Sequence, residues 1–195
     1  MDLDEFRRRL AGARAPAASV YGDDGAEERH AAGVTPAAVL VPVVDHPEAP
    51  TVLFTRRTAQ LKKHSGQISF PGGRAEPSDP SIEFTALRET LEEIGLPPEK
   101  VEVIAALPEY FTRTGFRVTP VIGLLTPPLE LAPDPREVAE VFEVPLKFFL
   151  DARNRQRRTR EFQGQTVGYY VFEYQGRVIW GATAGMLVNL YRMLE

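Results

Sequence analysis

The chain has 195 residues, of which 43% are hydrophobic, and a formal net charge of -4 at neutral pH. That length suits one domain with a full hydrophobic core, and the lack of cysteine excludes a disulfide framework and thiol catalysis. The acidic balance gives no general reason to bind nucleic acid, and the longest apolar runs are too short to span a membrane. The acidic start, Met1-Asp2-Leu3-Asp4-Glu5, is unlike a secretory signal, so we expect a cytoplasmic protein.

The N-terminal third predicts a helix, an arm and two strands. Apolar residues recur at helical spacing within residues 2–11, which predicts a short amphipathic helix. Residues 11–36 are rich in Ala, Gly and Pro and predict an extended arm. We therefore divide the chain into an N-terminal helix and arm, residues 1–36, and one domain, residues 37–195. That domain opens with two predicted buried strands, at residues 37–44 and 51–55.

The most informative stretch of the chain is residues 88–96. It carries three carboxylates at i, i+3 and i+4, which a helix places on one face: Glu89, Glu92 and Glu93. Apolar residues recur around the opposite face and predict its buried side: Phe84, Leu87, Leu91 and Ile94. Like charges at these spacings repel, whereas a divalent cation would turn the repulsion into attraction, and hard oxygen ligands suit Mg²⁺ or Mn²⁺. The alternative on these residues alone is a solvated acidic face.

The second half predicts more strands and a closing helix. Apolar runs predict strands at residues 101–107, 117–124 and 138–144. A short helix is expected from Pro145, a hairpin around Gln175-Gly176, and an amphipathic helix over residues 181–194. One basic run is expected to be a solvated face or a mobile loop: Arg153, Arg155, Arg157, Arg158 and Arg160. The mixture of strands and helices predicts an α/β fold.

The segment before the acidic helix carries the run Phe70-Pro71-Gly72-Gly73, whose glycines allow a close backbone approach to a ligand. Together with Asp79 and residues 88–96, it resembles the Nudix box of hydrolases that cleave nucleoside diphosphates linked to another moiety. The second half of the box matches the family pattern except at Thr90, where an aliphatic residue is usual. In the first half, Pro80 occupies the expected glutamate position and Asp79 lies one residue early, so the role of the first acid is open.

This resemblance implies a Nudix-like α/β/α sandwich with a mixed sheet and a catalytic loop-helix-loop. It implies Mg²⁺ or Mn²⁺ held by Glu89, Glu92 and Glu93, an orienting role for Arg88, and a loop shaped by Gly72 and Gly73. A loop acid in such enzymes often serves as general base, and two residues are candidates: Glu137 and Glu140.

A second block narrows the resemblance. Residues 53–57, followed by Lys62, Gly66 and the Phe-Pro-Gly-Gly run, resemble the signature of coenzyme A pyrophosphatases, and residues 180–183 resemble this branch more weakly. The branch implies cleavage of coenzyme A into 4′-phosphopantetheine and adenosine 3′,5′-bisphosphate. It places substrate-binding groups in one segment: Arg57, Lys62, His64, Gly72 and Gly73.

Two other functions remain open from the sequence. One is hydrolysis of another nucleoside diphosphate conjugate, such as ADP-ribose. The other is a non-catalytic nucleotide-sensing module. Such modules usually lose the box glutamates, whereas this chain keeps them. The oligomeric state is also open, with a homodimer among the alternatives.

Overall fold

The computed structural model describes residues 1–13, 33–60, 65–162 and 164–195. Most of the predicted arm, residues 11–36, lies outside these ranges, and so do Lys62 and His64. The helices of the described residues are α1 (Leu3–Gly12), α2 (Ile82–Ile94), α3 (Leu146–Phe149) and α4 (Ala182–Leu194). None of the helices in these ranges has the length and apolar character of a membrane span.

The larger sheet is mixed. Its central strands β1 (Thr35–Val44) and β7 (Phe116–Leu125) run parallel, with Thr35 opposite Phe116 and Val44 opposite Leu125. The other pairings in this sheet are antiparallel, and five strands lie in the order β3-β2-β1-β7-β5. Its remaining strands are β2 (Thr51–Arg57), β3 (Ile68–Ser69), β4 (Gly72–Arg74), β5 (Val101–Ala106), β6 (Tyr110–Phe111) and β8 (Val138–Pro145).

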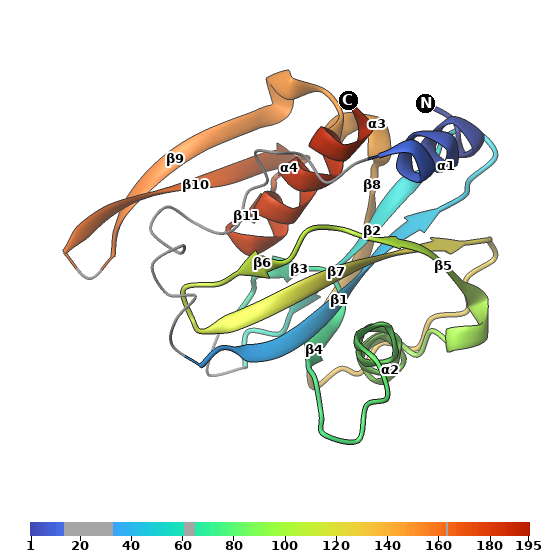
Figure 1. Ribbon diagram of the computed structural model, residues 1–195, viewed down its shortest axis with the longest axis horizontal. Helices are drawn as coiled ribbons and strands as arrows, with labels where there is room; N and C mark the ends of the chain where they lie inside the picture. Colours follow the sequence, from blue (N-terminus) through green and yellow to red (C-terminus); the bar gives the residue numbers. More distant parts are fainter. Residues whose placement is uncertain (14–32, 61–64, 163) are drawn as a thin grey trace.

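Helices cover both faces of this sheet, with α2 on one side and α1 and α4 on the other (Figure 1). Alternate residues of β1 enter the two cores, because successive side chains of a strand point to opposite faces. Val41 and Val43 pack in the cluster with α1 and α4, while Leu40 and Val44 pack in the cluster with α2. The predicted α/β class, with a mixed sheet between helices, is confirmed.

The N-terminal helix is part of this core. Asp2 accepts a hydrogen bond from the Glu5 backbone N–H and caps α1, as short polar side chains do at helix starts. Phe6 and Leu10 are buried in the same cluster as α4. The helix expected over residues 2–11 is therefore confirmed, while the domain boundary at residue 36 stays a prediction.

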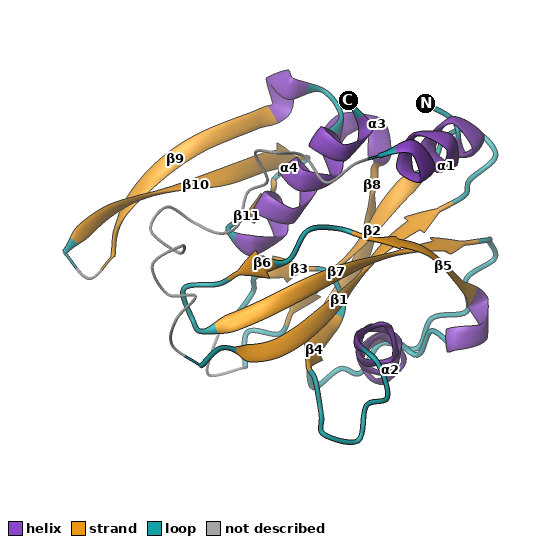
Figure 2. Ribbon diagram, viewed as in Figure 1, coloured by secondary structure: helices purple, strands orange, loops and turns teal. Residues whose placement is uncertain are grey.

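A smaller sheet is made of β9 (Arg155–Phe162), β10 (Gln165–Tyr174) and β11 (Arg177–Trp180). Its long β9–β10 hairpin projects away from the larger sheet (Figure 2). Of the two expectations for the basic run, the mobile loop was wrong, because most of the run forms β9, whereas Arg157 and Arg158 are exposed as a solvated face requires. Guanidinium groups of this strand lie over aromatic rings, Arg157 over Tyr170 and Arg160 over Trp180, which favours an ordered strand despite the like charges.

The buried side of α2 also differs from the prediction. Phe84 and Leu91 are 45% and 43% exposed, whereas Ala86 and Thr90 are fully buried against the sheet. The helix approaches the sheet through these small residues, and the buried Thr90 hydroxyl donates to the Ala86 carbonyl oxygen at 2.6 Å. Ile94 is buried and Leu87 packs against the same cluster, as predicted, but the helix turns Phe84 and Leu91 outward and rotates part of its acidic face toward the sheet.

A close contact between α4 and β6 provides a test of this packing. A Cβ on Gly185 would lie 2.3 Å from Cε2 of the buried Tyr110 ring. We expect Gly185→Ala to destabilise the fold by about 1–3 kcal/mol, because neither the helix nor the ring has room to move. Thermal unfolding measures the effect. The control is Gly12→Ala in α1, where no atom lies within 4 Å, and a Tm loss equal in both variants would contradict the contact.

Candidate active site

Local capping residues mark both ends of the acidic helix. The Ser81 side chain accepts from the Phe84 backbone N–H at the start of α2, and Gly95 ends the helix with a φ of 70°. The helix packs against β1 and β4, which brings its carboxylates beside the Gly72–Gly73 strand.

The two glycines of β4 allow two different close approaches. Gly72 has a φ of 151°, and a Cβ there would lie 2.3 Å from the Ala38 carbonyl oxygen of β1. A Cβ on Gly73 would instead meet the Glu89 carboxylate, 2.4 Å from Oε2. Gly72 thus fits the strand to the sheet, and Gly73 leaves room for a carboxylate of α2.

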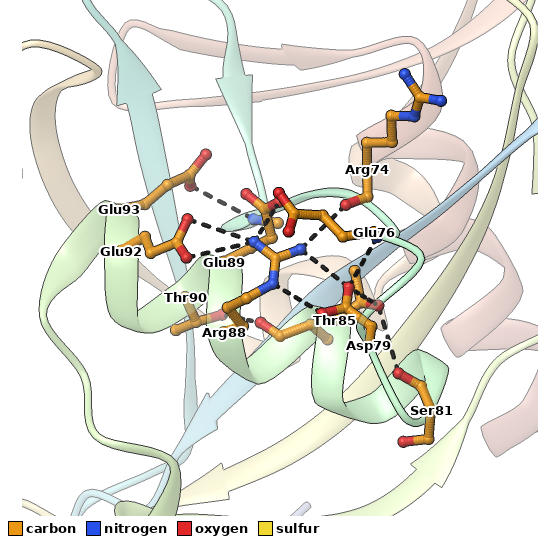
Figure 3. A network of polar contacts seen from close by, with 12 residues as sticks. Arg74, Glu76, Asp79, Ser81, Thr85, Arg88, Glu89, Thr90, Glu92 and Glu93 are labelled. Carbon is orange, nitrogen blue, oxygen red and sulfur yellow. Dashed lines mark hydrogen bonds and ion pairs between the residues drawn. The ribbon is translucent and has the colours of Figure 1, made fainter.

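Arg88 lies at the centre of a polar network along the helix (Figure 3). Its Nε and Nη2 donate to the two Asp79 carboxylate oxygens at 3.1 and 3.0 Å. Its Nη1 contacts Glu89 at 3.0 Å and Glu92 at 3.3 Å, and its Nη2 also donates to the Arg74 carbonyl oxygen. Arg88 therefore ties two of the predicted ligands to the loop.

Asp79, whose role the sequence left open, anchors this arginine. Its side chain is only 3% exposed, and it also accepts from the Thr85 hydroxyl and the Glu76 backbone N–H. The Arg88 guanidinium, followed by these hydrogen bonds, holds the pKa of Asp79 well below its usual range. Its proximity to Arg88 within one box was the sequence signal for this role, although the one-residue shift obscured it.

Glu93 is the most buried of the three helix acids, with 6% of the residue exposed. Its Oε2 accepts from the Gly72 backbone N–H at 3.4 Å, and its Oε1 lies 3.7 Å from Nη1 of Arg57. Burial raises the pKa of Glu93 to about 8, and the Arg57 charge offsets only part of this effect. Glu92, in contrast, has a 59% exposed side chain.

Glu89 and Glu137 complete the acidic group. Burial raises the pKa of Glu89, with Arg88 opposing, and the charges of Glu92 and Glu137 raise it further. Glu137 precedes β8, and its Oε2 lies 4.0 Å from Nη2 of Arg57. The structure therefore brings Glu137 toward Glu89 and Glu93.

Glu140 is placed differently. It pairs with Arg177 of β11 and, at 3.1 Å, with Arg56 of β2. Arg56 and Arg57 are neighbours on β2, but their carboxylate partners are different groups. Of the two candidate general bases, only Glu137 shares a partner with the helix acids.

The donor chemistry of this acidic group fits a hard divalent ion. Glu89, Glu93 and Glu137 all offer oxygen ligands, and the charge of Glu137 raises the pKa of both Glu89 and Glu93. Within the described ranges, no three acidic or histidine side chains are close enough, as they stand, to hold an ion. Binding of a cation would therefore require these side chains to draw together.

A cavity of about 320 Å³ opens beside the acids. The end of the cavity nearest the acids is lined by Arg57, Gly72, Gly73 and Arg74. Other parts of the lining come from residues that the sequence did not single out for binding, among them Thr112, Thr114 and Met186. Thr183, on the same wall, belongs to the segment 180–183 that weakly resembles the coenzyme A branch. A larger cavity of about 630 Å³, beside α1 and β5, contains none of the predicted site residues.

The comparisons with known proteins agree with this fold. A family model for the NUDIX domain matches residues 34–163, and the chain therefore belongs to the Nudix family. Members of this family are hydrolases of nucleoside diphosphate derivatives and generally use divalent metal ions such as Mg²⁺ or Mn²⁺.

Several bacterial relatives are each described as an uncharacterized Nudix hydrolase, NudL. The Pectobacterium atrosepticum protein is 44% identical over 162 residues, covering 79% of this chain and 80% of the relative. The Photorhabdus laumondii protein is 43% identical over 159 residues, covering 82% and 84%. These relatives support the hydrolase class and leave the coenzyme A branch a prediction.

Solved structures support the same class. The crystal structure of a Nudix hydrolase from M. smegmatis, RenU, has a TM-score of 0.50 and 30% identity, covering 60% of this chain and 73% of that one. A C. elegans Ap4A hydrolase binary complex has a TM-score of 0.50 at 20% identity, covering 57% and 80%, and shows the fold alone.

Proposed function

We propose that this Nudix hydrolase cleaves the pyrophosphate bond of coenzyme A to 4′-phosphopantetheine and adenosine 3′,5′-bisphosphate. The observation that carries the proposal is the position of Arg57, a residue of the coenzyme A pyrophosphatase signature, between the acids and the adjoining cavity. A guanidinium there is matched to a substrate that carries phosphate groups.

The geometry supports the following role for each residue. Glu89, Glu92 and Glu93 would hold Mg²⁺ or Mn²⁺, with Glu93 buried beside Gly72 and Glu92 reaching in from the exposed side. The ion supplies charge neutralisation of the diphosphate when bound. Arg88, fixed by Asp79, orients Glu89 and Glu92. Glu137 is the acid that we assign to accept the proton of the attacking water, in preference to Glu140.

In the reaction, the oxygen of water forms a new bond to one phosphorus as the bridging P–O bond breaks. The bridging oxygen leaves with the other phosphate, and the proton from water goes to a base. The cytoplasmic location and a homodimer stay predictions.

Turnover of a small substrate panel tests the proposal. We expect kcat/KM for coenzyme A to exceed that for 3′-dephospho-coenzyme A and ADP-ribose by at least about tenfold, roughly 1.4 kcal/mol. A basic group matched to the 3′-phosphate is left unpaired by an analogue that lacks it. Initial rates with Mg²⁺ and with Mn²⁺ measure the ratio.

Each outcome of the panel is informative. Equal efficiency on all three substrates would reject the coenzyme A preference and leave the hydrolase class standing. Turnover of ADP-ribose alone would favour the second function, and no turnover of any conjugate would favour the nucleotide-sensing module.

A further inference from the structure

Arg57 ends β2 at an irregularity in the sheet. The pairing of β2 with β8 shifts register between Arg56 and Arg57, and such bulges redirect side chains. The Arg57 backbone N–H is fixed by a 3.0 Å hydrogen bond to the Gln67 carbonyl oxygen. The bulge sends consecutive arginines to different acids, Arg56 to Glu140 and Arg57 to Glu93 and Glu137.

The side chain of Arg57 is held much more loosely than its backbone. Its two ion pairs, to Glu93 and Glu137, measure 3.7 and 4.0 Å, both longer than a hydrogen bond. Its Nε is buried and has no hydrogen-bond partner among the described residues. A guanidinium offers five N–H donors, so these contacts leave most of its bonding capacity unused.

Arg57 also lies between two binding regions. It bridges two carboxylates of the acidic group, and it lines the 320 Å³ cavity beside Gly72 and Gly73. A cation bound by Glu93 would compete with the guanidinium for the Glu93 carboxylate. The same side chain already lines the cavity, so its release from the acids would leave a cation beside a bound substrate.

We propose that Arg57 is an exchangeable ion-pair partner, which holds Glu93 and Glu137 in the metal-free protein and pairs with a substrate phosphate once a divalent ion takes its place. Arg57 is then a specificity-determining residue that couples the two binding events, so that each ligand favours the other. This inference rests on the proposed function for the identity of the phosphate, but not for the competition between Arg57 and the ion.

The first test measures Mn²⁺ affinity by calorimetry without nucleotide. Because the ion no longer has to displace a cation, we expect Arg57→Ala to bind Mn²⁺ at least about fivefold more tightly than the native protein. Arg57→Lys keeps the charge but cannot bridge both acids, so its affinity should fall between the two. The matched control is Arg153→Ala, whose side chain is 88% exposed and paired with Asp151, and which should bind as the native protein does.

The second test measures the coupling with a product as probe. Adenosine 3′,5′-bisphosphate should tighten Mn²⁺ binding by the native protein about 5- to 150-fold, and this factor should fall toward one in Arg57→Ala. The control Arg153→Ala should keep the native coupling factor. Thermal unfolding in the presence of a chelator shows whether each variant is folded. If Arg57→Ala does not fold, the same measurements are made on Arg57→Lys.

Weaker Mn²⁺ binding by folded Arg57→Ala would overturn the proposal, because it would mean that Arg57 only orders the acids. An unchanged coupling factor would overturn it as well. A failure of the proposed function is detected separately, because the native protein would then not turn over coenzyme A. In that case ADP replaces adenosine 3′,5′-bisphosphate as the probe.

Discussion

Glu93→Gln is expected to lower kcat by at least about a hundredfold while leaving the fold intact. The amide preserves the volume of the side chain but cannot supply the negative charge that a metal ligand needs. Glu93 is the acid that the fold buries beside the Gly72 backbone N–H and Arg57, so a neighbouring residue cannot take its place. Steady-state rates at saturating metal measure the loss, and Glu92→Gln is expected to change kcat in the same direction.

The matched control is Glu83→Gln, which removes the same charge from the exposed first turn of α2. Its turnover should equal that of the native protein. Near-native rates in both Glu92→Gln and Glu93→Gln would refute the assignment of this helix as the metal site. A loss of stability without a loss of turnover would instead indicate a structural ion-pair network.

Glu93→Gln is also predicted to change the thermal stability of the protein when a chelator removes the metal. The pKa of Glu93 is about 8 in the fold, against an ordinary value of 4.5, so the folded state keeps a proton that the unfolded chain loses. The stability contributed at this site is therefore present at low pH and declines as pH rises from about 4.5 to about 8. Glu93→Gln should match the native Tm near pH 5 and exceed it by several degrees near pH 8. Equal Tm values at both pH values would contradict the raised pKa.

The two glycines of β4 should respond in opposite ways to the same substitution. In Gly73→Ala, the new methyl group meets the end of the flexible Glu89 side chain, which can swing aside. We expect a kcat loss of at least about tenfold with little change in Tm, since an ill-placed ligand reduces catalysis more than it disturbs packing.

In Gly72→Ala, the methyl group meets the backbone of β1 at Ala38 and Val39, which cannot yield, and the φ of 151° disfavours any side chain. We expect a stability loss above about 3 kcal/mol. Thermal unfolding and kcat, measured on both variants, separate the two effects. Equal stability losses, or native turnover in Gly73→Ala, would contradict these roles.

Local patterns in the sequence were sufficient for much of the fold. The strand expected at residues 37–44 is the core of β1, because a strand buried on both faces appears as a continuous apolar run. The acidic helix was predictable from the i, i+3 and i+4 spacing of its carboxylates, and its ends from Ser81 and Gly95. These signals lie within a few residues of the structure that they specify.

Tertiary packing decided which residues lie together at the site. Ala86 and Thr90 set the rotation of α2 against the sheet, and that rotation buries Glu93 and leaves Glu92 and Leu91 exposed. Helical periodicity defines faces of a helix but not which face the sheet accepts.

Strand pairing decided the rest. Arg57 and Glu137 lie far apart in the sequence and approach each other because β2 pairs with β8. The basic run forms strand β9 because β10 supplies its hydrogen bonds and aromatic rings. The sequence by itself determined the hydrolase family, the acidic helix and most strands, whereas non-local pairing determined which charges meet, since no short segment contains both partners of such a contact.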